Sequence, residues 1–415
     1  MKGKIWLCLC GMVLLLAGCH NETPEPEPSE LHPTSSKNRV VLAYLISNNK
    51  AGANLDSNLK DNVRWMYEGL AAAKDTCSLL VFYRPYSSDQ TLPHPTILSY
   101  TTDGHGRINK SPVLSGSNLN ATNVLKEGYV EKEYTDEDFN ATAPTTMATV
   151  LADMRNIVTA PSYGLIFGSH GTGWLEASNT IGARSFGDDQ RYSINIPEMA
   201  NAIRTAFHGQ KADFILFDAC MMGAAEVCYE LRNTAAYCVA SMLETPVDGL
   251  PYNQFFPTLY KDVPDYVQII DEAIAYNKSK GSWGAYAWVD LSQMEQLAQA
   301  VKTELILHDE QAKSIGYDNN SQLLQYGYRE FKYISFDMAE IIQLLNDGEL
   351  PESFKQAFDQ AVLYKSSMSD NTYLKENDRY SGMGMYLPDR GIKSKWDAYY
   401  PQLGWYQAAG WSELQ

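Results

Sequence analysis

Five short apolar runs constrain the fold of this chain more than any other feature. Each run ends at small or polar residues, which is typical of a strand buried on both faces of a sheet. Segments with apolar residues at helical spacing lie between several of these runs. Strands that alternate with helices predict right-handed βαβ units, and therefore an α/β fold with a mostly parallel central sheet flanked by helices. The runs are Val40–Ile46, Ser78–Tyr83, Tyr163–Phe167, Asp213–Phe217 and Ala236–Ser241.

The pattern weakens after Trp283. One more strand is expected near residues 285–289, and most of the remaining chain has helical periodicity. We therefore predict a main α/β domain over residues 39–290 and a C-terminal α-rich extension, residues 291–415, packed on it. The helices expected there are 293–307, 338–345 and 352–364, with a late strand at 383–387.

The first nineteen residues have the pattern of an export signal. Two lysines precede an apolar run, residues 5–16, that is too short to span a bilayer comfortably. The run ends in Leu16-Ala17-Gly18-Cys19, which resembles the lipobox of bacterial lipoproteins. Residues 1–18 would then be the signal peptide, and Cys19 would be acylated. The alternative is an ordinary signal peptide cleaved near Ala17.

Residues 19–38 include the run Pro-Glu-Pro-Glu-Pro and have no apolar periodicity, so they are interpreted as an extended tether. The sequence thus predicts an exported protein that is lipid-anchored to the cell envelope. It leaves open whether the protein is periplasmic or exposed on the surface of the outer membrane.

The net charge of the chain argues against one class of binding partner. The chain has 50 acidic against 33 basic residues, a net charge of −17. Nucleic-acid binding needs clustered Lys and Arg, so no nucleic-acid partner is expected. The seven cysteines are too few for a disulfide scaffold at this length.

Reactive side chains follow two of the predicted strands. His170 lies in the Gly-rich segment 168–174, and Cys220 lies in segment 218–223. Because chemistry in an α/β sheet gathers beyond the carboxyl ends of the strands, we expect the two side chains to lie close together. A Cys with a His about 50 residues upstream is associated with caspase-like peptidases. Taken singly, Cys220 is more often a small core residue and His170 a hydrogen-bonded loop residue, but their joint placement favours catalysis.

The segments Ser169-His170-Gly171-Thr172-Gly173-Trp174 and Asp218-Ala219-Cys220-Met221-Met222-Gly223 resemble the clostripain family of cysteine peptidases, which belongs to a larger group with caspases and gingipains. The resemblance implies a caspase-like fold and an endopeptidase that cleaves proteins or peptides after Arg or Lys. It makes Cys220 the nucleophile and His170 the general acid. The amides of Gly171 and Cys220 become the oxyanion donors. It places Asp218 in the S1 pocket, with Asp248 as a second candidate acid there.

The resemblance also implies self-processing between the His and Cys segments. Arg184 is our first choice for the cleaved position, and Arg191 is the second. Many family members depend on calcium, but the sequence assigns no ligands and no metal site. The acidic stretch 134–138 is better explained as a solvated loop. The alternative function is a catalytically inactive surface lipoprotein that binds a protein or glycan partner.

Overall fold

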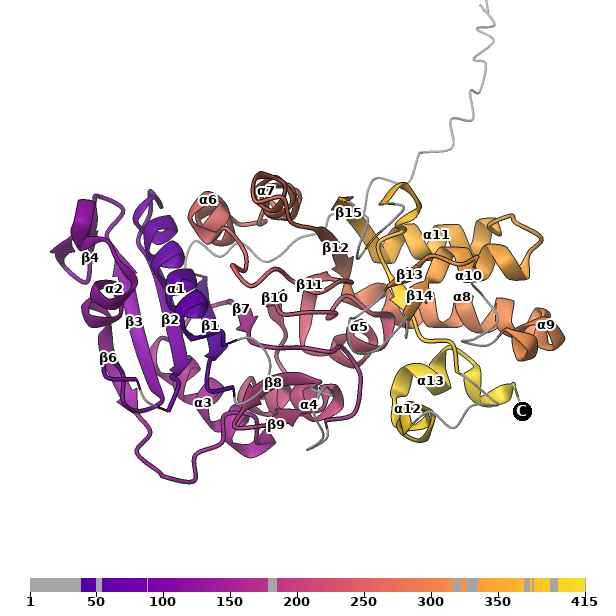
Figure 1. The fold of residues 1–415 in the computed structure, drawn as a ribbon, viewed down its shortest axis with the longest axis horizontal. Helices are drawn as coiled ribbons and strands as arrows, with labels where there is room; N and C mark the ends of the chain where they lie inside the picture. Colours follow the sequence, from indigo (N-terminus) through magenta and orange to yellow (C-terminus); the bar gives the residue numbers. More distant parts are fainter. Residues whose placement is uncertain are drawn as a thin grey trace, which may run out of the picture. The chain divides into compact units, whose positions relative to one another are not determined.

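The folded part of the chain is built on one large sheet. The computed structural model describes residues 39–49, 54–87, 89–177, 185–315, 322–326, 335–368, 374, 377–388 and 395–414. They fall within one compact unit, residues 33–415. The sheet has eleven strands in the order β15-β12-β11-β10-β7-β1-β2-β3-β4-β5, and β6 also pairs with β3 (Figure 1).

Its centre is parallel, as the five apolar runs predict. Neighbouring central strands pair in parallel register, in the order β2-β1-β7-β10-β11. The predicted α/β architecture is therefore confirmed, and each of the five runs forms one of these strands. The bounds are β1 Val40–Ile46, β2 Cys77–Arg84, β7 Tyr163–Gly168, β10 Ala212–Asp218 and β11 Ala235–Ser241.

Both edges of the sheet are antiparallel, so the sheet as a whole is mixed. On one side β12 pairs with β11 and β15 pairs with β12. On the other side β3 pairs with β2, β4 and β6 pair with β3, and β5 pairs with β4. These strands are β3 Thr96–Thr102, β4 Arg107–Ile108, β5 Ser111–Pro112, β6 Tyr129–Glu133, β12 Gly284–Asp290 and β15 Val362–Met368.

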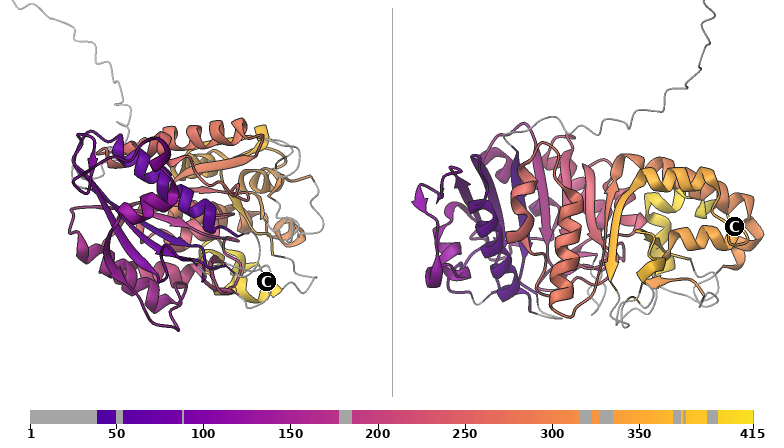
Figure 2. Two further views of the ribbon diagram at one scale, coloured as in Figure 1. Left: turned by 60° about the vertical axis from the view of Figure 1, so that its left-hand side comes forward. Right: turned by 90° about the horizontal axis from the view of Figure 1, so that it is seen from above.

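Helices cover both faces of the sheet (Figures 1 and 2). Along β1, Leu42 and Tyr44 belong to one hydrophobic cluster, and Val41 and Ala43 belong to the other. Helices α3, α4 and α5 contribute to the first cluster, and α1, α2, α6 and α7 contribute to the second. The bounds are α1 Asp56–Ala71, α2 Ala121–Glu127, α3 Pro144–Ile157, α4 Ile196–Ala206, α5 Ala225–Leu231, α6 Tyr252–Phe255 and α7 Tyr266–Ser279.

The C-terminal part is rich in helices, as expected. It also contains a small sheet in the order β13-β14-β16. The residue ranges are α8 Met294–Leu307, α9 Asp309–Ser314, β13 Gln325–Tyr326, β14 Ser335–Asp337, α10 Met338–Leu345, α11 Glu352–Ala361, β16 Gly384–Met385, α12 Lys395–Tyr399 and α13 Gly404–Ala408. In the part of the chain that the structure describes, none of the helices has both the length and the apolar character needed to cross a membrane.

One predicted helix was wrong at its end. Residues 352–364 were expected to be helical, but α11 stops at Ala361, and Val362 begins β15. The edge of β12 offers a ladder of backbone hydrogen bonds, and the β-branched or aromatic side chains of Val362 and Tyr364 suit a strand. Sheet pairing therefore overrides the helical periodicity here. The domain boundary at residue 290 stays a prediction.

Candidate functional site

The predicted catalytic side chains follow two neighbouring parallel strands. Gly168, the last residue of β7, is in register with Asp218, the last residue of β10. The amide of Ser169 also donates a hydrogen bond to the carbonyl of Asp218 at 3.4 Å. His170 and Cys220 each lie two residues beyond this pair. The two loops therefore start side by side at the carboxyl edge of the sheet.

The two loops also touch beyond their starting points. A Cβ atom built on Gly171 would lie 2.7 Å from the carbonyl oxygen of Cys220. One built on Gly173, which has a φ of +67°, would lie 2.7 Å from the carbonyl oxygen of Met221. A side chain larger than hydrogen would push the loops apart at both points. The Gly-rich composition of the His170 segment is what permits this contact.

Met221 follows Cys220 in an unusual backbone conformation. Its φ is +60°, although it is not glycine and its side chain is buried. Such a residue costs about 1–3 kcal/mol and persists only where the surroundings hold it. Its amide donates to the carbonyl of Leu243 at 3.0 Å, and the amide of Gly223 donates to the carbonyl of Ser241 at 2.9 Å. These bonds fix the Cys220 loop to the end of β11.

A two-stranded hairpin, β8 Phe186–Asp189 and β9 Tyr192–Ile194, supports the His170 loop from its other side. The amide of Gly187 donates to the carbonyl of His170 at 2.9 Å, and the amide of Thr172 donates to the carbonyl of Ser185 at 3.1 Å. Between these bonds, Gly171 forms an antiparallel bridge with Phe186. Because the flanking residues make the hydrogen bonds, Gly171 and Phe186 form a non-hydrogen-bonded pair, in which the N–H of Gly171 points away from β8.

The thiol of Cys220 lies against the segment that follows β11. Its Sγ atom accepts a hydrogen bond from the amide of Thr245 at 3.3 Å, and the Thr245 hydroxyl donates to the carbonyl of Ala219 at 3.1 Å. The indole N–H of Trp283 donates a hydrogen bond to the carbonyl of Glu244 at 2.8 Å. Burial, and then the carboxylates of Glu244 and Asp218, raise the pKa of the thiol to about 12, against the lowering effect of the Thr245 amide. With this pKa, the thiol is protonated at neutral pH.

Asp218 is buried and held through one oxygen. Its Oδ2 atom accepts hydrogen bonds from the amide of Leu250 at 3.1 Å and from the hydroxyl of Tyr252 at 2.9 Å. Burial raises the pKa of Asp218 to about 6, although both hydrogen bonds lower it. Gly249 has a φ of +73°, and a Cβ atom there would lie 2.6 Å from Oδ2. The turn can approach the carboxylate this closely because that residue is glycine.

Asp248 belongs to the same turn, but its carboxylate is held by α7. The Tyr276 hydroxyl donates to its Oδ2 atom at 3.2 Å, and the Lys280 ammonium lies 3.9 Å from that atom. The backbone carbonyl of Asp248 accepts a hydrogen bond from the side-chain amide (Nδ2) of Asn62 in α1 at 2.8 Å. Asp248 therefore lies in the turn that contacts Asp218, and the Oδ2 atom of Asp248 already accepts a hydrogen bond from Tyr276.

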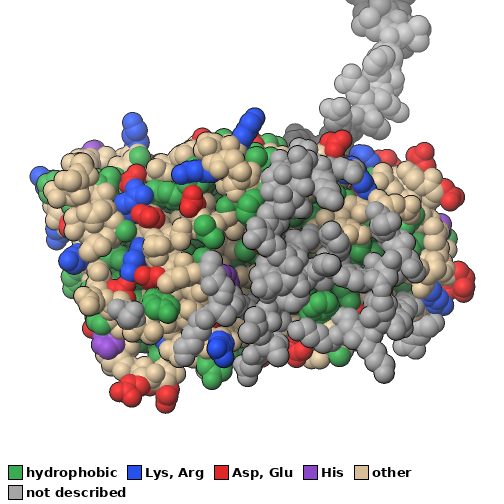
Figure 3. Space-filling view, in the orientation of Figure 1, with side chains coloured by type: hydrophobic (Ala, Val, Ile, Leu, Met, Phe, Trp, Pro, Cys, Tyr) green, Lys and Arg blue, Asp and Glu red, His purple; other side chains and the backbone are tan. Residues whose placement is uncertain are grey.

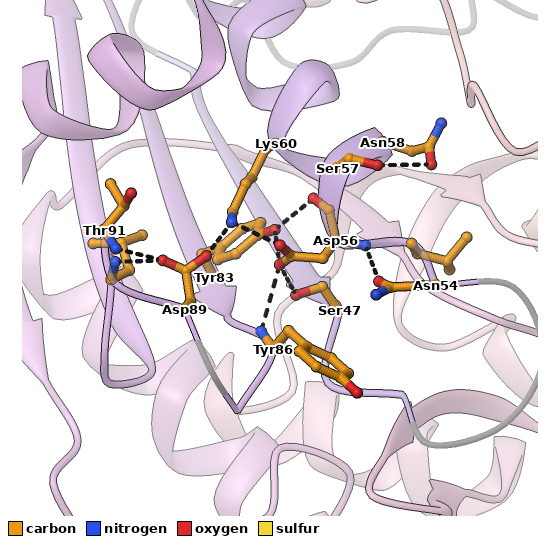
Figure 4. Close-up of polar contacts among 12 residues, drawn as sticks. Ser47, Asn54, Asp56, Ser57, Asn58, Lys60, Tyr83, Tyr86, Asp89 and Thr91 are labelled. Carbon is orange, nitrogen blue, oxygen red and sulfur yellow. Dashed lines mark hydrogen bonds and ion pairs between the residues drawn. The ribbon is translucent and has the colours of Figure 1, made fainter.

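A polar cluster orders the chain around the end of β1 (Figure 4). The Lys60 ammonium of α1 lies between the carboxylates of Asp56, at 2.6 Å, and Asp89. Asp56 also accepts hydrogen bonds from the hydroxyls of Ser47 at 2.9 Å and Tyr83 at 3.1 Å. Ser47 is the first residue beyond β1, so the cluster ties α1 to the sheet beside the His170 loop.

Sequence reasoning missed the residues that hold this site together. Tyr252, Asn62 and Tyr276 support the two acids, and Trp283 supports the segment against the thiol. Each lies on an element remote in sequence from the group that it contacts. A single Tyr, Asn or Trp has no motif that would reveal such a contact.

The described residues include no cluster of the usual metal-ligating side chains. Among the described residues, no three His, Cys, Asp or Glu side chains are grouped so as to hold a metal ion. Asp136, Glu137 and Asp138 are exposed. Calcium, which the resemblance suggests, therefore has no ligands assigned among the described residues, and the proposed mechanism has no step through it. Cys19 and Arg184 lie outside the described residues.

On the face in Figure 3, acidic and basic side chains are interspersed over the described part.

Comparisons with known proteins identify the fold and the family of this chain. A comparison with curated protein sequences finds no match. Among solved structures, an inactive zymogen C11 protease from Parabacteroides distasonis is similar, with 24% identity and a TM-score of 0.71, over 91% of this chain and 99% of that one. A secreted C11 cysteine protease from Bacteroides thetaiotaomicron, solved with an irreversible peptide inhibitor, gives the same identity, coverage and TM-score. These likenesses support the fold. The model of the clostripain family matches residues 43–415, so the chain belongs to the clostripain family of cysteine peptidases.

Proposed function

We propose that this protein is an endopeptidase that cleaves after Arg or Lys, with Cys220 as the nucleophile and His170 as its proton-transfer partner. One observation carries the proposal. The loops that bear these two residues leave adjacent parallel strands and pack in backbone contact, with Gly171 against the carbonyl of Cys220. Family membership supports the same chemistry and favours it over an inactive binding protein.

The proposed reaction starts from the protonated thiol. As Sγ forms a bond to the substrate carbonyl carbon, its proton passes to the imidazole of His170. The negative charge that develops on the carbonyl oxygen is stabilised by the N–H groups of Gly171 and Cys220. His170 then returns the proton to the leaving amine as the C–N bond breaks. Water hydrolyses the resulting thioester, releases the new carboxyl group and restores the thiol.

Asp218 supports the choice of a cationic P1 residue. It lies two residues before the nucleophile, and a carboxyl with a pKa of about 6 is mostly ionised at neutral pH. Within the described part of the chain, both hydrogen bonds to the carboxylate end on Oδ2, which leaves Oδ1 to receive a cation. A one-oxygen contact suits the point charge of Lys as well as the fork of Arg. Asp248 is proposed as the second acid of the pocket.

Self-processing is proposed at Arg184. The alternative position, Arg191, lies in the tight turn between β8 and β9, where Gln190 and Arg191 have φ values of +56° and +83°. A turn of that kind is not the extended backbone that a protease cleft accepts, which favours Arg184. The similar protease from P. distasonis was solved as an inactive zymogen, and this supports maturation as part of the proposal.

Export and lipid anchoring at Cys19 are also proposed. They are supported by residues 1–19 and by the secreted nature of the similar protease from B. thetaiotaomicron. The Pro/Glu-rich tether would hold the folded part away from the membrane.

The test of the proposed activity uses a thiol-reactive peptide ketone that ends in Arg. We expect the purified full-length protein to be labelled on Cys220 and to hydrolyse an Arg peptide amide. The Cys220→Ala variant should show neither reaction, and His170→Ala should lose about 10²–10⁴-fold in turnover. A Cys220→Ala variant that retains more than a few per cent of turnover would refute the assignment. A preference for Asp or Leu at P1 would refute the role of Asp218.

A further inference from the structure

The C-terminal chain crosses directly over the helix that follows the Cys220 loop. Helix α5 begins five residues after Cys220. Just before it, Ala224 forms a parallel bridge with Gly384 of β16. On its first turn, the carboxyl of Glu226 accepts a hydrogen bond from the amide of Tyr386 at 2.8 Å. The same oxygen, Oε1, accepts one from the hydroxyl of Tyr400 at 3.2 Å.

The two tyrosines that meet Glu226 also contact the His170 loop. Trp174 lies four residues after His170 and is buried. Its ring centroid lies 4.9 Å from that of Tyr386 and 5.0 Å from that of Tyr400. Aromatic pairs at this separation pack in direct contact. Glu226, which follows the Cys220 loop, and Trp174, which follows His170, therefore both contact the same two tyrosines.

We propose that Glu226 is a positioning residue of the catalytic centre: it holds Tyr386 and Tyr400 against Trp174 and thereby keeps the His170 loop in place relative to Cys220. The inference rests on the catalytic roles proposed for His170 and Cys220. It also gives the C-terminal part of the chain a role in catalysis, because Tyr386 and Tyr400 both belong to that part.

The chemistry of the position argues against simple packing. Glu226 is fully buried, and its Oε2 atom has no hydrogen-bond partner among the described residues. Burial raises its pKa to about 7. Other acids nearby are Glu230, one turn along α5, and Asp397, which accepts the Tyr386 hydroxyl at 2.7 Å. A carboxyl in such a site costs folding free energy that an apolar residue of similar size would avoid. What an apolar residue would lose is the acceptor for the two tyrosines.

Glu230 provides a matched control on the same helix. Its half-buried carboxyl accepts a hydrogen bond from the backbone amide of Gly404 at 2.5 Å and one from the backbone amide of Trp405 at 3.4 Å. Both donors belong to α13. Glu226 and Glu230 thus lie one turn apart on α5, and each accepts hydrogen bonds from the C-terminal part of the chain, although Glu230 is only half-buried. They differ in that only the partners of Glu226 are the tyrosines that flank Trp174.

The experiment compares Glu226→Leu, Glu226→Gln and Glu230→Leu in the full chain. We measure kcat and KM with an Arg peptide amide, and the rate of Cys220 alkylation by iodoacetamide, read by mass spectrometry of the Cys220 peptide. Glu226→Leu should lower kcat at least tenfold with KM unchanged within twofold, and should slow alkylation at least fivefold. Glu226→Gln keeps the acceptor oxygen and should recover kcat to within threefold of the wild type. Glu230→Leu should keep kcat within threefold of the wild type, even if its melting temperature falls as much as that of Glu226→Leu.

Equal losses of kcat in Glu226→Leu and Glu230→Leu would overturn the proposal, as would a Glu226→Leu variant with unchanged kcat. If Glu226→Leu does not fold, Tyr400→Phe removes one of the two donors and should lower kcat about threefold with KM unchanged; no effect would overturn the proposal. Alkylation needs no substrate. A wild type that ignores Arg substrates but shows the expected alkylation pattern would therefore refute the P1 specificity and leave the positioning role supported.

Discussion

The carbonyl oxygen of Cys220 lies 2.7 Å from the position that a Cβ atom on Gly171 would occupy. The backbone of the His170 loop therefore rests on the backbone of the residue proposed as the nucleophile. Because both residues are proposed oxyanion donors, their separation sets the width of the oxyanion site.

Gly171→Ala should separate these loops. A methyl group cannot share space with a backbone carbonyl, so we expect a fall in kcat of at least tenfold and a loss of about 1–3 kcal/mol of stability. Peptide hydrolysis and urea unfolding measure the two effects. Gly209→Ala is the control, since Gly209 has a φ of +79° and nothing lies within 4 Å of its Cβ position. That variant should lose stability through backbone strain and keep kcat; an equal loss of kcat in both variants would contradict the expectation.

Cation binding at Asp218, in the proposed S1 pocket, should weaken in acid. Asp218 has a pKa of about 6, so its carboxyl becomes neutral as the pH falls below 6. The dissociation constant of a competitive guanidinium inhibitor should then rise up to tenfold per pH unit. Tyr252→Phe removes a hydrogen bond that lowers this pKa, so the weakening should begin at higher pH. Inhibitor titrations from pH 4.5 to 8 provide the measurement, and an identical pH dependence in Tyr252→Phe would be evidence against Asp218 as the titrating group.

Folding stability should carry a pH dependence from Glu226. Its pKa is about 7 in the folded chain and near its ordinary value of 4.5 in the unfolded chain, so the folded state binds the proton more tightly. The contribution is fully present below pH 4.5 and is lost as the pH rises to 7 and above. Between pH 5.5 and 8 it amounts to about 2 kcal/mol. Urea unfolding of the wild type should show this loss relative to Glu226→Gln, and the same pH slope in both proteins would exclude it.

Processing should occur at Arg184 and spare Arg191. The wild type should give two chains on denaturing electrophoresis, the second beginning at Ser185, and these should remain associated because β7 and β10 belong to one sheet. Arg184→Ala should stay uncut, whereas Arg191→Ala should be cut as in the wild type. A fully active, uncut wild type, or cleavage of isolated Cys220→Ala, would rule the prediction out.

Lipid attachment should depend on Cys19. Cys19→Ser should move the protein from the detergent phase to the aqueous phase in a Triton X-114 partition. Cys10→Ser, within the predicted signal peptide, is the control and should leave partitioning unchanged. Another segment would have to anchor the protein if Cys19→Ser stayed in the detergent phase.

Local patterns were enough to predict the centre of the fold. The run Val40–Ile46 coincides with β1, and the runs before His170 and Cys220 coincide with β7 and β10 to within one residue. The carboxyl ends of parallel strands share one edge of a sheet, so the meeting of the two loops could also be predicted. Period and strand polarity are properties of short segments, and a sequence displays them directly.

Contacts between distant segments were decided only by the tertiary structure. The end of α11 depends on the pairing of β15 with the edge of β12, and the orientation of Asp218 depends on Tyr252, 34 residues away. Glu226 and Tyr386 are 160 residues apart. Nothing in the local sequence of either partner distinguishes it from other buried residues of its type. The sequence by itself therefore determined the parallel core and the two reactive loops. Tertiary packing decided which side chains hold those loops, because such contacts arise only when separate elements are brought together around the sheet.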